Sequence, residues 1–354
     1  MFPKAAEMSV LTTQREERAT TVTRARLVLA AVCATAIGAA VIPASAAGFP
    51  RTGNLTNALG QGSYTDAPGL DPVAIQTSGM KVAWSSKITG EPYASPIRVG
   101  GTVIAATEEN HVAGLSLADG HKLWDVKLGK PWSANNLHFK SGQFCPDLQP
   151  DIGITGTPVV DPNKQTIYLT SKQADGRNPR LAHLFLYAIR VADGKVAWRT
   201  EIGGAANNVR GAIFNATTAN QRSGLMMLDG RLYFTTSSHC TIGPYRGWVM
   251  GVDVRTHRMT AKWTSASKNG SEKFTQGGNG IWMGAGAPTS DGPGRLFVST
   301  GNGPAPAPGD VTSLHYGMSV VRFQIGRRGQ LNVADYYSPA FADVLNVSDS
   351  DLHR

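Results

Sequence analysis

The chain has 354 residues and a formal net charge of +9, with 17% charged and 41% hydrophobic residues. This balance excludes a disordered polyelectrolyte and fits one large domain or two ordinary ones. The 40 glycines and 20 prolines argue against long helices and favour many short strands joined by tight turns.

A secretory signal peptide is predicted over residues 1–46. The apolar run Leu27–Ile42 follows Arg24 and Arg26 and leads into an Ala-Ser-Ala sequence, the pattern of a cleavable leader. The alternative is a membrane anchor, but this run is shorter than the ~20 residues that a spanning helix needs. We therefore expect a secreted or extracytoplasmic protein that begins near Ala47 and keeps no stable membrane span after cleavage.

A lead-in segment is expected over residues 47–79, followed by repeats over 80–354. Two repeats share one turn, ADGHKLW at Ala118–Trp124 and ADGKVAW at Ala192–Trp198. An Asp-Gly turn between alternating strands predicts a β-hairpin. The tryptophan four residues after each glycine would fill the space between neighbouring sheets.

Four repeats and a fragment predict a β-propeller. The repeats run over 95–129, 157–203, 223–265 and 287–339, and residues 81–90 look like the last strand of another copy. The 40 residues from Trp84 to Trp124 match one four-stranded blade. The longer intervals to Trp198 and Trp263 leave room for loop insertions. We expect an all-β propeller of about four to five four-stranded blades; a β-sandwich is the rival, but it would not repeat one hairpin with one tryptophan.

The ADGxxxW units resemble the tryptophan-docking repeats of the quinoprotein alcohol dehydrogenase-like propellers, the pyrroloquinoline-quinone (PQQ) repeat superfamily. Two further stretches are similar to segments of secreted bacterial PQQ-like propellers: SSHCTIGPYRGWVMGVDVRTHRMTAKW and GGNGIWMGAGAPTSDGPGRLFVSTGNG. The resemblance covers roughly residues 80–352 and implies a propeller. Such propellers usually have seven or eight blades, so we expect this one to be incomplete, with a truncated C-terminus.

Two functions follow from the resemblance. The first is a secreted, non-catalytic propeller that binds an unknown protein or polymer ligand through loops on one face. The second is a PQQ- and calcium-dependent dehydrogenase that oxidises an alcohol or sugar. The chain lacks the vicinal cysteines typical of the dehydrogenases, and no Glu, Asn and Asp set for their calcium aligns with specific positions, so the binding module is favoured. No run of five basic residues occurs, so no nucleic-acid partner is expected.

Two stretches are candidate ligand sites. Gly278, Asn279 and Gly280 would let a planar cofactor approach the backbone, with Trp282 as a stacking platform. The alternative is a turn that enters a blade, with Trp282 in the core.

A second group, near the C-terminus, offers oxygen ligands at short spacing for calcium: Asn346, Asp349 and Asp351. It lacks the central Gly and the distal Glu of a calcium loop, and a solvated loop is the alternative.

Cys145 and Cys240 remain after the leader is removed. In an oxidising compartment we expect them to form one disulfide; the alternative is two separate buried thiols. No C-x-x-C or H-x-x-x-H spacing predicts a metal site around them.

Overall fold

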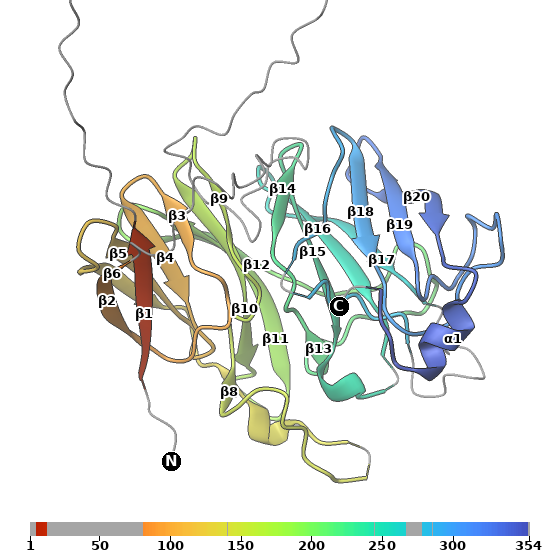
Figure 1. Cartoon of the computed structure of the whole chain (residues 1–354), viewed down its shortest axis with the longest axis horizontal. Coiled ribbons are helices and arrows are strands. Elements are labelled where there is room, and N and C mark those ends of the chain that lie inside the picture. The colour runs from red at the N-terminus through yellow and green to blue at the C-terminus, as the bar shows by residue number, and fades with distance from the viewer. Residues whose placement is uncertain are drawn as a thin grey trace, which may run out of the picture.

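The computed structural model describes residues 81–139, 141–243, 245–266, 278–284 and 286–352, together with the backbone of 5–12. These residues form antiparallel sheets, which lie side by side in chain order (Figure 1). The predicted cleavage site and lead-in segment lie outside the described residues, and the first strand falls inside the predicted leader. Among the described residues, no helix has the length and apolar character to cross a membrane.

Short strands separated by tight turns build each sheet. The first sheet pairs β1 (Ala5–Thr12) with β2 (Lys81–Thr89). The next has the order β3 (Ile97–Val99), β4 (Thr102–Ala106), β5 (His111–Ser116) and β6 (Lys122–Lys127). The third consists of β9 (Val159–Asp161), β10 (Thr166–Ala174), β11 (Ala182–Arg190) and β12 (Val196–Glu201).

The remaining sheets complete the series. One contains β13 (Ala219–Asn220), β14 (Met226–Leu228), β15 (Arg231–Ser238), β16 (Trp248–Asp253) and β17 (Met259–Thr264). The last contains β18 (Arg295–Ser299), β19 (Val320–Ile325) and β20 (Leu331–Tyr337), and the helix α1 (Ala342–Val347) follows it. Four-stranded antiparallel sheets confirm the expected all-β propeller class. Among the described strands, β2 pairs with β1 and none joins it to the last sheet.

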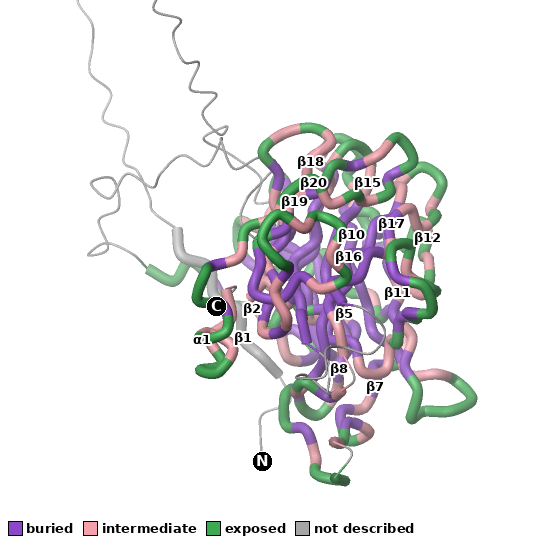
Figure 2. Tube along the Cα trace, turned by 90° about the vertical axis from the view of Figure 1, so that its right-hand side faces the viewer, coloured by how far each residue is buried: buried purple, intermediate pink, exposed green. Residues whose placement is uncertain are grey.

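The core lies between consecutive sheets. Separate buried clusters fill each gap: Ile104 and Val112 meet Leu169 and Ile189 between the second and third sheets. The buried positions follow the strands and the exposed ones the connecting loops (Figure 2). Each sheet therefore depends on its neighbours to cover its faces, as repeat proteins generally do.

Tryptophans dock each sheet on the next. The indole N–H of Trp84 donates to the carbonyl of Leu117, and that of Trp124 donates to the carbonyl of Val191. A Cβ on Gly120 would collide with the Trp84 ring, and Gly120 has a left-handed φ of 74°. This explains why the ADG turn ends in glycine: the neighbouring indole lies directly on its Cα.

The third docking site differs. Trp198 stacks on His257, with ring centroids 4.3 Å apart, where the other turns have glycine. Trp124 and Trp198 are half-buried between neighbouring sheets. Trp263 does not hold the equivalent place. Trp124 and Trp198 lie opposite Gly114 and Ala188, but Trp263 lies two residues farther along its strand.

A small insertion after β6 carries the first half of the candidate site. It contains β7 (Trp132–Ser133), a 3-10 turn over Ala134–Asn136 and β8 (Asp151–Ile152). Its own apolar cluster includes Trp132, Leu137 and Cys145 and packs against Ile242 of the third repeat. This packing holds the insertion over the ends of β10 and β15.

Candidate functional site

The glycine-rich stretch is a junction between the third and fourth repeats. The Asn279 side chain is fully buried; its backbone N–H donates to the Asn302 carbonyl at 2.6 Å, and its carbonyl accepts from Gly247 N–H at 3.0 Å. Gly280 has no room for a Cβ, because the Trp282 ring and the Ser237 hydroxyl occupy that place. The Trp282 indole N–H donates to the Ser238 carbonyl at 3.2 Å. The stretch thus packs on protein, and Trp282 lines a neighbouring cavity.

The predicted calcium ligands hold the loop at Asn302 and Gly303. Asp351 Oδ1 accepts from the Asn302 backbone N–H at 2.7 Å, and Asp349 Oδ1 accepts from the Asn302 side-chain amide. Asn346 exchanges two hydrogen bonds with the Gly303 backbone, at 2.9 and 3.0 Å. The structure therefore gives these three side chains a loop-anchoring role, and calcium binding there stays a prediction.

The two predicted sites meet at one place. Asn302 binds Asn279 through its carbonyl and Asp351 through its N–H, so one residue joins the two groups. A cavity of about 420 Å³ lies there. We call it the acidic pocket; it is lined by Asp147, Asn220, Arg222, Ser238, Cys240, Thr241, Tyr245, Trp282, Gly284, Asn302, Asp349 and Asp351.

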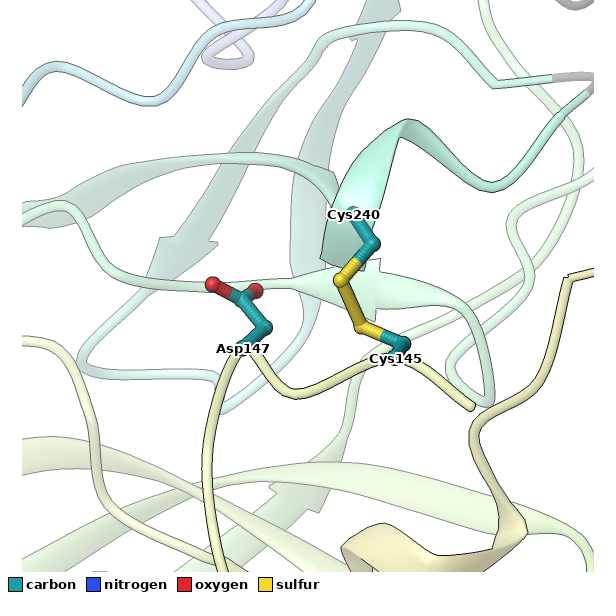
Figure 3. A group of neighbouring side chains, drawn as sticks. All are labelled: Cys145, Asp147 and Cys240. Atoms are coloured by element: carbon teal, nitrogen blue, oxygen red, sulfur yellow. A yellow bond between two sulfur atoms is a disulfide. The ribbon is translucent and has the colours of Figure 1, made fainter. Parts of the chain in front are cut away.

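The disulfide forms part of the wall of the acidic pocket. Cys145 of the insertion is joined to Cys240, two residues after β15, with the Cα atoms 6.0 Å apart. The carboxylate of Asp147 lies beside the two sulfurs (Figure 3). The disulfide expected from the sequence is thus present, and it brings Asp147 to the pocket.

Asp147 is fixed by two further contacts. Its Oδ2 lies 3.0 Å from His239 Nδ1 and accepts a hydrogen bond from the Asn220 amide at 3.2 Å. The hydrogen bond from His239 is the main reason that the Asp147 pKa is lowered. Burial lowers the pKa of His239 to about 4. At neutral pH the contact therefore joins a neutral imidazole N–H to a carboxylate, and Nδ1 carries the proton.

Two buried ionisable groups, Glu108 and Lys172, interact electrostatically with Asp147. Burial raises the pKa of Glu108 to about 7, although Gly153 N–H and the Thr155 hydroxyl both donate to its Oε2. Burial also lowers the pKa of Lys172 to about 7. The Lys172 ammonium donates to the carbonyls of Thr217 and Ala219, each at 2.9 Å. Such perturbed pairs occur both at functional sites and in structural networks. The shifted pKa values of Glu108 and Lys172 therefore do not identify a reaction.

A comparison with protein families shows to which family the chain belongs. The model of the family described as outer membrane protein assembly factor BamB matches residues 65–269, more than half of the chain. The chain belongs to this family of PQQ-like repeat proteins. No curated protein matches the BamB-family chain.

Solved structures are similar to the chain at low sequence identity. A quinohemoprotein alcohol dehydrogenase from Pseudomonas putida HK5 is 18% identical over 73% of the BamB-family chain and 36% of its own, with a TM-score of 0.48. BamB from Moraxella catarrhalis is 14% identical over 72% of this chain and 51% of its own, with a TM-score of 0.36. The BamB-family chain thus spans between a third and about half of the length of these structures.

The acidic pocket of this BamB-family protein suits cationic or hydroxyl-bearing groups. Three carboxylates line it, those of Asp147, Asp349 and Asp351, against the guanidinium of Arg222. A pocket of about 320 Å³ adjoins it and shares Asp147, Asn220, Arg222 and Gly284. By contrast, a larger groove of about 1070 Å³ beside β20 and α1 is lined mainly by prolines, alanines and tyrosines.

Sequence reasoning missed most of the lining residues of the BamB-family pocket, and it also missed the buried groups Glu108 and Lys172. Ile104 and Tyr168 hold equivalent places in their sheets, and Glu108 and Lys172 each lie four residues after them. Comparison of these repeat positions could have found them. Asp147 and Arg222 lie in insertions, and no repeat position marks them.

Proposed function

We propose that the chain is an extracytoplasmic interaction module that binds a cationic segment of a partner protein in the acidic pocket. The observation that carries this proposal is the gathering of Asp147, Asp349 and Asp351 around one cavity of a chain whose net charge is +9. Opposite charge brought together in a partly desolvated cavity favours specific association. The family description as an assembly factor supports a protein partner.

The rigid wall of the pocket supports binding as well. The disulfide, the insertion cluster and the contacts of Asp147 fix the carboxylate before any ligand arrives. Preorganised groups lose little conformational entropy on binding. Secretion with removal of residues 1–46 belongs to this proposal, because disulfides persist in oxidising compartments.

A fluorescently labelled tetralysine peptide tests the proposal. We expect it to bind, a tetraglutamate peptide not to bind, and added salt to weaken the complex. Asp147→Asn should lower the affinity about five- to tenfold, corresponding to about 1 kcal/mol. The matched control is Asp335→Asn, which changes an exposed carboxylate on β20. Equal affinity for the two peptides, or equal loss in both variants, would contradict the proposal.

A PQQ- and calcium-dependent dehydrogenase is the second candidate. Trp282 and the Cys240 sulfur line the same cavity as three aspartates, a set that suits an aromatic ring and a hard cation. The fit to the quinone is poor, because PQQ carries three carboxylic acid groups and Arg222 is the cationic side chain among the described lining residues. When bound, the quinone would accept two electrons from an alcohol. Dye reduction by the chain with PQQ, calcium and a panel of alcohols and sugars would favour this candidate.

A further inference from the structure

We propose that Cys145, Cys240 and Asp147 bind a zinc ion when the disulfide is reduced, with a fourth coordination position open to the acidic pocket. The same three side chains would thus exist in two states. One is the disulfide with a neighbouring carboxylate (Figure 3), and the other is a two-thiolate, one-carboxylate metal site. This inference does not depend on the proposed peptide binding.

The positions of the ligand atoms carry the first step. The two sulfurs and a carboxylate oxygen of Asp147 all lie within 4.8 Å of one another. A tetrahedral zinc ion with Zn–S bonds of about 2.3 Å places its two sulfurs about 3.8 Å apart. Reduction frees the sulfurs to separate to that distance by side-chain rotation, while the Cα atoms stay 6.0 Å apart. The backbone therefore already holds the three ligands at a usable spacing.

The surroundings of Asp147 supply the second step. Metal-binding carboxylates are commonly held by outer hydrogen bonds, which fix the ligand and raise its affinity. Here the His239 imidazole and the Asn220 amide both contact Asp147 Oδ2, at 3.0 and 3.2 Å. Asn220 ends β13 and His239 follows β15, whereas Asp147 comes from the insertion. The carboxylate is thus held beside the sulfurs by residues that are not ligands.

Access to the pocket supplies the third step. Cys145 is fully buried, but Cys240 and Asp147 line the acidic pocket. Cys240 is partly buried, so we expect a dithiol reductant to approach the disulfide from this side, and a water molecule from the pocket to complete the coordination of zinc. Three protein ligands with one open position are typical of zinc sites that bind or activate a small ligand.

The redox and proton balance is simple. A dithiol reductant gives two electrons and two protons to the Cys145–Cys240 disulfide and is itself oxidised to a disulfide. The two thiols then lose their protons to solvent as Zn²⁺ binds both thiolates. The disulfide form of the reductant can take the two electrons back from the thiolates, with two protons from solvent, and is reduced to the dithiol. This reoxidation expels the ion, since a disulfide sulfur is a poor ligand.

Cobalt(II) provides the test, because it reports thiolate ligands in its absorption spectrum. The full chain is reduced with a phosphine, freed of reductant without air, and titrated with Co²⁺. We expect one equivalent to give a thiolate-to-cobalt charge-transfer band and visible bands of a tetrahedral ion, and zinc to abolish both. The chain that has not been reduced should show neither.

Three variants sharpen the test. Cys240→Ser should remove the charge-transfer signal of a two-thiolate site, and Asp147→Ala should lower cobalt affinity at least tenfold while both thiols remain. Asp151→Ala, on the same insertion, should leave the affinity unchanged. Far-UV circular dichroism of the reduced chain should keep its β-sheet spectrum. The proposal is overturned by a reduced chain that unfolds, by absence of the band, or by unchanged affinity in Asp147→Ala.

Discussion

His239 Nδ1 lies 3.0 Å from Asp147 Oδ2 across a sequence separation of 92 residues. The contact joins the insertion of the first repeat to the turn after β15, and the neighbouring residues Cys145 and Cys240 form the disulfide. A covalent bond and a hydrogen bond thus connect the same two segments. The wall of the acidic pocket consequently depends on both.

The first prediction concerns the pH dependence of stability. The pKa of His239 is lowered from 6.5 to about 4, so the unfolded state binds the proton first and stability falls as the pH drops from about 6.5 to 4. The pKa of Glu108 is raised from 4.5 to about 7, so the folded state binds the proton first and stability falls as the pH rises from about 4.5 to 7. The two trends oppose each other, and we expect a nearly flat profile between pH 4.5 and 6.5.

Two variants separate these trends in urea unfolding. Glu108→Gln should make stability rise with pH across this window, by about 1.4 kcal/mol per pH unit at most. His239→Gln should make it fall with pH by a similar amount. Parallel profiles for the two variants would show that the burial of one of these groups has been misassigned.

The disulfide gives a second prediction. The cysteines are separated by 95 residues, and a bridge closing such a loop stabilises by about 4.7 kcal/mol in the chain-entropy model. The double variant Cys145→Ser with Cys240→Ser should therefore unfold at lower urea concentration. A peptide map without reductant should join the two cysteine peptides, whereas two alkylated free thiols would refute the bridge.

The docking tryptophans give a third prediction. Trp124→Ala and Trp198→Ala should each lower the free energy of unfolding by about 2–3 kcal/mol, less than a fully buried tryptophan, because both rings are half-buried. Trp84→Ala should cost at least as much, since Trp84 is only 8% exposed. Variants that melt within a degree or two of the parent would exclude the docking role.

The place of Gly280 leads to a fourth prediction. Gly280→Ala would force a methyl group against the Trp282 ring and Ser237, so it should destabilise the chain by about 1–3 kcal/mol and alter tryptophan fluorescence. Gly101→Ala is the control, because nothing lies within 4 Å of its Cβ position. Equal effects of the two substitutions would show that the contact with Trp282 is absent in solution.

The sequence was sufficient for the fold but not for the site. Asp-Gly turns followed by tryptophan recur locally, so Trp124 and Trp198 could be assigned to equivalent strands that the structure confirms. The third repeat has two residues more between its turn and Trp263, and spacing alone did not reveal this shift. The burial of these rings depends on neighbouring sheets and has no local signal.

The residues of the acidic pocket come from segments far apart in the chain. Asn302 joins Asn279 to Asp351 through backbone hydrogen bonds, which no spacing rule predicts. Asp147 lines the pocket because a disulfide and His239 hold it in place. Both contacts join residues more than 90 positions apart, so the sequence alone does not reveal them. The two candidate ligand groups were therefore predicted separately from the sequence. That both lie at one pocket was not predicted.

The most direct test of the central claim is to map where a cationic ligand binds. A tetralysine peptide carrying a photo-reactive benzophenone is cross-linked to the full chain and the adducts are located by mass spectrometry. The account predicts adducts at residues that line the acidic pocket, such as Arg222, Tyr245 and Trp282, and their loss in Asp147→Asn. Adducts confined to the groove beside β20 and α1, unchanged in that variant, would contradict it.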